Sequence, residues 1–192
     1  MLASITPLGE RGRGASWRRT VVFYVVASTA GGAVAGAVLG ALGSVMVGGL
    51  PAWLLAAAGA VALAAAALDV SGRLPAIHRQ VDETWLTRYR DWVYGTGFGF
   101  QLGLGAVTIA TSASLYLTWV VELLLAAPVP SAVAGAVFGV ARALPLVGTA
   151  RVIDAESLRR AHRRWQARLP AARWATVAVQ ALGGLVLVVH AS

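Results

Sequence analysis

The sequence contains no cysteine and no lysine, and it has few charged residues of any kind. The missing cysteines exclude disulfide scaffolds, thiolate metal sites and cysteine nucleophiles. Only 12% of the residues are charged, against about a quarter in average soluble domains. Together with 58% hydrophobic residues and a mean hydropathy of +0.71, this shortage of charge excludes a water-soluble globular domain.

Long apolar runs take the place of the missing charge. A run of about 20 apolar residues crosses a bilayer as a helix, because the backbone must satisfy its own hydrogen bonds in lipid. The sequence therefore predicts an all-α, polytopic membrane bundle in one domain over residues 20–190. We expect five spans, at residues 20–43, 52–68, 94–121, 131–150 and 171–189. Glycines and prolines in residues 44–51 and 122–130 predict tight hairpin turns.

The arginines predict the orientation of these spans. All sixteen basic residues are arginines, and they give the chain a net charge of +8. Four lie in the N-terminal segment 1–19, four in the loop 69–93, and seven between residues 151 and 173. The two hairpin turns and the C-terminal tail have none. The positive-inside rule then places the N-terminus in the cytoplasm and the C-terminus outside. We expect a multi-pass protein of the plasma (inner) membrane, with cytoplasmic loops at 69–93 and 151–170.

The third basic segment has the pattern of an interfacial helix. Asp154 can cap it, and apolar residues recur at helical spacing up to Leu169. We expect it to bind anionic lipids of the inner leaflet through Arg159, Arg160, Arg163, Arg164, Trp165 and Arg168. The alternative is a solvated basic linker. We expect no nucleic-acid binding, because the arginines fall between apolar runs instead of on one soluble face.

Glycines recur every four residues in two of the predicted spans. Glycine faces let helix backbones approach closely in lipid. The helix-packing candidates are Gly32, Gly36 and Gly40 in the first span and Gly95 and Gly99 in the third, where Gly103 continues the pattern. Packing within the chain is the favoured interpretation, and a homodimer or a membrane-complex partner is the alternative.

Arg142 is the one charged residue that the pattern places deep within a span, where a charge is costly. Gln101, Gln180, Ser28 and Thr29 are expected at similar depth, and Thr108 continues the polar line outward. A guanidinium among amides and hydroxyls would suit a small anionic solute. Alternatively, Arg142 bonds carbonyls freed by Pro145 or extends to the headgroups. The hydroxyls alternatively bond their own helices.

No arrangement of residues indicates an enzyme or a cofactor. The acids, including Asp69, are expected in loops, and Glu122 at the outer end of a span, so no carboxylate pair forms. Three scattered histidines lack the spacing of metal ligands. We therefore expect no catalytic residue, no metal and no cofactor.

Three segments carry a resemblance to a known family. An arginine pair at Arg18 and Arg19 opens a glycine-rich span, residues 97–105 read GFGFQLGLG, and residues 139–145 read GVARALP. Over about residues 18–190 the chain resembles the transmembrane domain of the cytochrome c biogenesis CcdA and DsbD family, which is thought to be related to LysE-type exporters. Members of that family carry two redox cysteines and one helix before the basic segment, and this chain has neither.

The resemblance implies a helix scaffold with alternating access but without thiol chemistry. We expect a small permease or exporter, with Arg142 and the two glutamines near an anionic solute. Pro145, Gly103 and Gly105 would serve as hinges. The alternative is a non-transporting accessory subunit that assembles a larger membrane complex.

Overall fold

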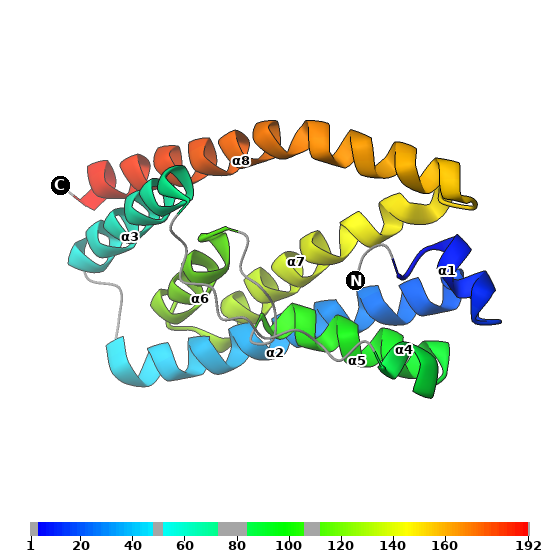
Figure 1. Ribbon diagram of the computed structural model, residues 1–192. Coiled ribbons are helices and arrows are strands. Elements are labelled where there is room, and N and C mark those ends of the chain that lie inside the picture. The colour runs from blue at the N-terminus through cyan, green and yellow to red at the C-terminus, as the bar shows by residue number, and fades with distance from the viewer. Residues whose placement is uncertain (1–3, 48–51, 73–83, 106–111, 192) are drawn as a thin grey trace. The chain divides into compact units, whose positions relative to one another are not determined.

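The computed structural model describes residues 4–47, 52–72, 84–105 and 112–191, and in these ranges the chain is helical with no strand (Figure 1). The all-α class is therefore confirmed. The elements are α1 (Pro7–Gly12), α2 (Trp17–Val47), α3 (Ala52–Ser71), α4 (Trp85–Arg88), α5 (Asp91–Leu104), α6 (Ser114–Leu124), α7 (Pro128–Val147), a 3-10 turn η1 (Gly148–Arg151) and α8 (Ala155–Ala191).

Four helices in the described part of the chain are long and apolar enough to cross a membrane. They are α2, α3, α7 with its η1 extension, and α8. Large apolar side chains stand exposed along these helices, among them Val26 at 63%, Val137 at 65% and Val179 at 71%. Such exposure suits a lipid environment, since water would penalise each of these side chains.

The third predicted span is not one continuous helix. Helix α5 ends at Leu104, and Gly105 follows in the left-handed conformation with φ 75°. Helix α6 begins at Ser114, whose N–H donates to the Ser112 hydroxyl at 3.1 Å. At 1.5 Å per residue these helices measure about 21 and 17 Å, and each is shorter than the roughly 30 Å hydrocarbon core.

The helix predicted in the basic segment 154–169 is present, and it is longer than the pattern indicates. Helix α8 runs through Pro170 without interruption and joins the basic segment to the fifth predicted span. At 37 residues it is about 56 Å long. Its predicted cap is confirmed: the Asp154 carboxylate accepts from the Ser157 N–H at 2.7 Å. The proline is tolerated because the freed Gln166 carbonyl lies at an exposed position.

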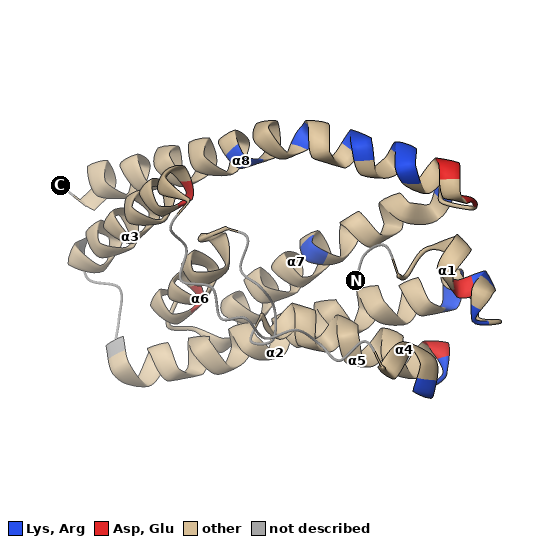
Figure 2. Ribbon diagram, in the orientation of Figure 1, with Lys and Arg blue, Asp and Glu red and all other residues tan. Residues whose placement is uncertain are grey.

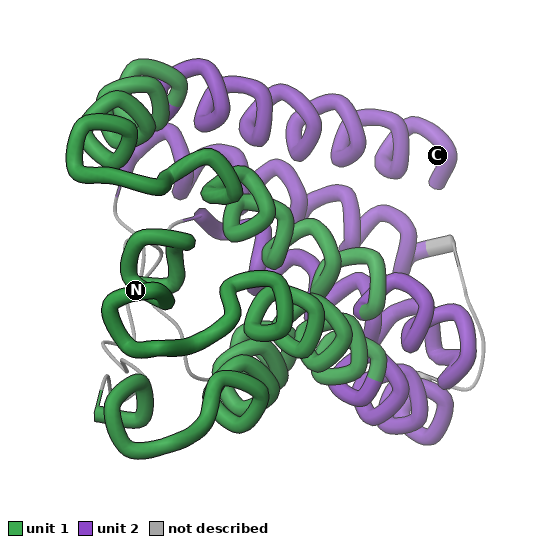
Figure 3. Tube along the Cα trace, turned by 90° about the vertical axis from the view of Figure 1, so that its right-hand side faces the viewer, with its two compact units in different colours: residues 1–33, 79–108, 136–168 green, residues 34–78, 109–135, 169–192 purple. Residues whose placement is uncertain are grey.

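The chain divides into two compact units, which Figure 3 colours separately and which we describe one at a time. Unit 1 comprises residues 1–33, 79–108 and 136–168. Its core packs aromatic and aliphatic side chains from α2, α5 and the end of α7, with Tyr94 and Phe98 each only 1% exposed. The short helix α1 adds Ile5 to this core from just before its first turn and docks on η1 through a Leu8 N–H to Val152 carbonyl bond of 3.0 Å.

Unit 2 comprises residues 34–78, 109–135 and 169–192 and is built on small side chains. The buried face of α3 is mostly alanine, from Ala58 to Ala66. Gly59 of α3 meets α8, because a Cβ added there would lie 2.7 Å from the Gly184 carbonyl oxygen. Small residues thus replace bulky ones where these backbones approach, as expected for helices packed in lipid.

Candidate functional site

The Ser28 and Thr29 hydroxyls, which were predicted to line a solute site, donate hydrogen bonds to backbone carbonyls within unit 1. Ser28 is fully buried and donates to the Gly139 carbonyl of α7 at 2.8 Å. Thr29 donates to the Val25 carbonyl of its own helix, also at 2.8 Å. Ser28 therefore joins α2 to α7, and Thr29 takes the alternative of bonding its own backbone.

The charged and amide candidates belong to both units. Arg142, on α7, lies over the Phe138 ring with its guanidinium carbon 5.4 Å from the centroid. Gln101 is half-buried on α5 in the same unit. Gln180 belongs to unit 2, where it is buried and donates to Asp69. Thr108 lies outside the described residues.

The glycine candidates stand where helices cross closely. In unit 1, a Cβ added at Gly95, Gly99 or Gly103 would lie 2.8, 2.2 or 2.0 Å from carbonyl oxygens of α2, and the Gly103 Cβ would also meet the Gly32 nitrogen at 2.8 Å. In unit 2, a Cβ at Gly36 would lie 2.0 Å from the Ser131 carbonyl oxygen, and one at Gly40 would lie 2.5 Å from the Ser131 hydroxyl. Of the hinge candidates, Gly105 ends α5 and Pro145 lies inside α7.

Asp69 is the centre of a polar cluster in unit 2, and its expected position in a loop is wrong. It lies in the last turn of α3 and is 6% exposed. Its carboxylate accepts from the Ser112 hydroxyl at 2.8 Å, the Ala113 N–H at 2.8 Å and the Gln180 amide at 3.0 Å. The carboxylate thus fixes the start of α6, where the helix dipole favours a negative charge.

Arg173 of α8 completes this cluster by binding backbone carbonyls at the end of α3. Its Nε and one terminal nitrogen donate to the Asp69 carbonyl at 3.0 and 2.7 Å, and the same terminal nitrogen reaches the Val70 carbonyl at 2.9 Å. A cavity of about 410 Å³ opens here, lined in part by Asp69, Ser112, Arg173 and Thr176. Deeper in α8, Gln180 keeps a buried Oε1 that accepts no hydrogen bond from the described residues.

A second polar cluster closes one end of unit 1 around Glu10 of α1. The Glu10 side chain is fully buried, pairs with Arg13 at 2.7 Å and accepts from the Thr20 hydroxyl at 3.1 Å and from the Tyr94 hydroxyl. Arg13 also donates to the Ser4 carbonyl at 2.7 Å. The buried carboxylate is therefore both paired and hydrogen-bonded, as a buried charge must be. The same bonds join α1 to α2 and α5.

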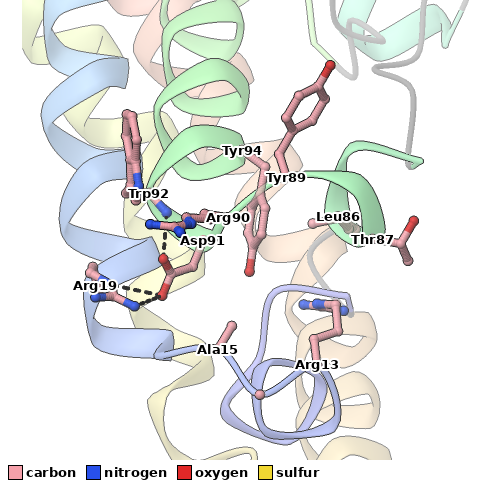
Figure 4. Close-up of a pocket in the computed structure, with 11 residues that line it drawn as sticks. Arg13, Ala15, Arg19, Leu86, Thr87, Tyr89, Arg90, Asp91, Trp92 and Tyr94 are labelled. Carbon is pink, nitrogen blue, oxygen red and sulfur yellow. Dashed lines mark hydrogen bonds and ion pairs between the residues drawn. The ribbon is translucent and has the colours of Figure 1, made fainter.

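A pocket of about 570 Å³ lies beside that cluster, and Figure 4 shows its lining. In this lining Asp91 pairs directly with Arg19 at 2.7 Å and accepts from the Ser16 N–H at 3.2 Å. Desolvation raises the pKa of Asp91, but the hydrogen bonds from Arg19, Ser16 and Trp92 together outweigh it and leave that pKa below its ordinary value. Arg13 and Arg19 in this pocket each have a carboxylate partner already.

The predicted lipid-binding arginines lie along the N-terminal half of α8, and Figure 2 shows their distribution. Arg160, Arg164, Trp165 and Arg168 line a groove of about 650 Å³ in unit 1, together with residues of η1. Arg159 and Arg163 are exposed and are not part of its lining. The helix therefore divides the predicted set between two faces.

Four buried acids were not predicted as site residues from the sequence: Glu10, Asp69, Asp91 and Glu122. Glu122 is 1% exposed on α6, and its carbonyl accepts from the Ser131 hydroxyl at 2.7 Å. The sequence could have indicated a buried role for Asp69, because it is a lone acid at the end of an alanine-rich run and belongs to the same helix. No such signal indicated Glu10, since a short arginine-flanked segment predicts exposure.

Comparison with protein-family models, with curated proteins and with solved structures finds no match to this chain.

Proposed function

We propose that the protein is a small integral membrane permease or exporter of the plasma (inner) membrane that moves a small anionic solute through the Asp69–Arg173 cavity. The carrying observation is that this cavity opens where a discontinuous helix begins, beside Ser112 and the start of α6. Transporters place their binding sites at such breaks, because helix ends and unwound backbone supply polar groups that a continuous helix cannot offer.

The chemistry of the cavity supports an anionic solute. Arg173 donates hydrogen bonds to the backbone carbonyls of Asp69 and Val70, and within the described ranges it makes no ion pair with a carboxylate. Its positive charge is therefore available to a solute, and Thr176 lines the same cavity. A solute anion would compete with the Asp69 carboxylate for the Ser112 hydroxyl and the Ala113 N–H, which are the groups that hold the start of α6.

The proposed topology keeps five crossings, with the N-terminus inside and the C-terminus outside. The helices α2, α3, α7 and the C-terminal half of α8 supply four crossings, and α5 and α6 together supply the broken one. This assignment is supported by contacts within unit 1 among segments predicted to be cytoplasmic: Leu8 bonds Val152, and Arg19 pairs with Asp91. The resemblance to the CcdA and DsbD family belongs to this proposal, without thiol chemistry.

The test is uptake into proteoliposomes of labelled sulfate, phosphate and glutamate, with empty vesicles as background. We expect uptake of at least one of these anions by the wild-type protein and a loss of tenfold or more in Arg173→Gln. Arg159→Gln is the matched control, since it removes the same charge from a position on the same helix that does not line the cavity. No uptake of any anion would refute transport, and undiminished uptake by Arg173→Gln would refute this site.

A second candidate function is a non-transporting subunit that assembles a larger membrane complex. It is favoured by the fact that Ser28, Thr29 and Gln180 all spend hydrogen bonds within the chain. Purification in mild detergent separates the two proposals. A stoichiometric foreign subunit supports assembly, whereas a monomer or homo-oligomer that transports in vesicles excludes it.

A further inference from the structure

The basic groove of unit 1 is formed where the end of α7 meets the start of α8. Its walls are η1, with Arg151, and the face of α8 that carries residues 157, 160, 161, 164, 165 and 168. These α8 positions form two series, 157, 161 and 165 and 160, 164 and 168, each with a spacing of four, so they share one side of the helix. Apolar side chains also line the groove, among them Val147, Val152 and Ala161.

The charge of this groove has one sign. Its lining includes four arginines (Arg151, Arg160, Arg164 and Arg168) and no carboxylate. Arg160 pairs with Glu156, outside the lining, whereas Arg151, Arg164 and Arg168 make no ion pair within the ranges described. The pocket around Arg13 and Arg19 differs, because carboxylates already neutralise both of its paired arginines. An excess of unneutralised guanidinium groups in a concave site favours a phosphate ligand.

Trp165 gives the groove an amphipathic edge. The indole is half-buried in the same face as Arg164 and Arg168. Tryptophan prefers the boundary between headgroups and acyl chains, where its ring is in an apolar layer and its N–H meets polar groups. The apolar lining residues and this ring suit acyl chains next to a phosphate, whereas a free soluble anion would need neither.

We propose that this groove is a binding site for the phosphate headgroup of an anionic phospholipid in the cytoplasmic leaflet. Basic pockets beside membrane helices on that side bind anionic headgroups in this way. The assignment narrows the predicted lipid contact from the whole basic helix to one of its faces and adds Arg151 from η1. It does not depend on whether the chain moves a solute.

The test compares two double variants that remove the same charge from the same helix. Arg164→Gln with Arg168→Gln alters the groove, and Arg159→Gln with Arg163→Gln alters the face outside it. Purified protein in an uncharged detergent is titrated with phosphatidylglycerol, and the first bound lipid is followed by native mass spectrometry. Phosphatidylcholine with the same acyl chains and inorganic phosphate serve as the other two probes.

We expect the groove variant to bind phosphatidylglycerol about 30-fold more weakly, at the usual contribution of each arginine near a membrane surface. The outer-face variant should stay within about twofold of wild type, and phosphatidylcholine should bind at least about tenfold more weakly than phosphatidylglycerol. Equal losses in both variants, or equal binding of the two lipids, would overturn the proposal. Displacement of phosphatidylglycerol by millimolar phosphate would reassign the groove to a soluble anion.

A single variant guards against misfolding. Arg151→Gln changes one side chain of η1 and should weaken phosphatidylglycerol binding about fivefold. Circular dichroism and size-exclusion profiles identical to wild type would show that the fold is retained. If the folded Arg151→Gln variant binds phosphatidylglycerol with wild-type affinity, η1 is not part of the site and the proposed binding groove is refuted.

Discussion

Replacing Gly103 by alanine tests whether α2 and α5 are held at glycine-limited distance. The added Cβ would lie 2.0 Å from the Ser28 carbonyl oxygen and 2.8 Å from the Gly32 nitrogen. An ordinary contact begins at 3.4 Å, so the two helices would have to separate by up to about 1.4 Å. Both obstacles are backbone atoms, and no change of rotamer can relieve the clash.

The size of the effect follows from two opposing terms. Alanine favours a helix over glycine by at most about 1 kcal/mol. Overpacking of a close interface costs about 1 to 3 kcal/mol, and a clash with backbone atoms belongs at the upper end. We therefore expect a net loss of about 2 kcal/mol in the free energy of unfolding. For a chain of this size that corresponds to a fall in Tm of roughly 4 to 8 °C.

Gly183→Ala is the matched control for this substitution. Gly183 is also inside a long helix, but a Cβ added there meets nothing within 4 Å. Only the helix-propensity term remains, so Tm should stay constant or rise by roughly 2 to 4 °C. Both melting points are measured in the same detergent by fluorescence-detected size exclusion. If the Tm of Gly103→Ala equals or exceeds the Tm of Gly183→Ala, the close packing of α2 on α5 is refuted.

Three further predictions concern the polar contacts of unit 1. Ser28→Ala should lower the free energy of unfolding by about 0.6 to 1.7 kcal/mol, which is the range for interhelical hydrogen bonds in membranes. Thr29→Val loses only a bond to its own helix and should change that free energy by less than about 0.5 kcal/mol. Equal effects of the two variants in denaturation curves would contradict this distinction. Glu10→Ala should cost about 3 kcal/mol, because it leaves Arg13 partly buried without its partner, and restoration of the wild-type Tm by adding Arg13→Ala would confirm that the unpaired charge is the cause. The pKa of Asp91 is lowered in the folded state, so its stabilising contribution is complete above the unfolded value of about 3.9 and is lost as pH falls through the lower folded value. The Tm difference between wild type and Asp91→Asn should therefore shrink below about pH 4, and a difference that grows on acidification would reverse the sign of this argument.

Some features of this protein could be predicted from the sequence because they depend on local order. The all-α class follows from runs such as residues 20–43 and 52–68, whose apolar length leaves the backbone no alternative in lipid. The cap at Asp154 follows from its side-chain oxygen and the N–H of Ser157, three residues away. Glycines at spacing four share one helix face by geometry alone, so Gly95, Gly99 and Gly103 predict a close contact without identifying the partner.

Tertiary structure decided which polar groups meet. Asp69 binds Ser112, Ala113 and Gln180, which are 43, 44 and 111 residues away in the chain. Hydropathy reads only the average over a window, so it treated residues 94–121 as one span and missed the end of α5 at Leu104. It also missed that Pro170 lies inside α8, because a proline's effect depends on whether water or another donor can reach the freed carbonyl. Sequence order thus determined that the chain is helical and which helix faces are small or charged. The partners of those faces depend on contacts between distant segments, which no local pattern encodes.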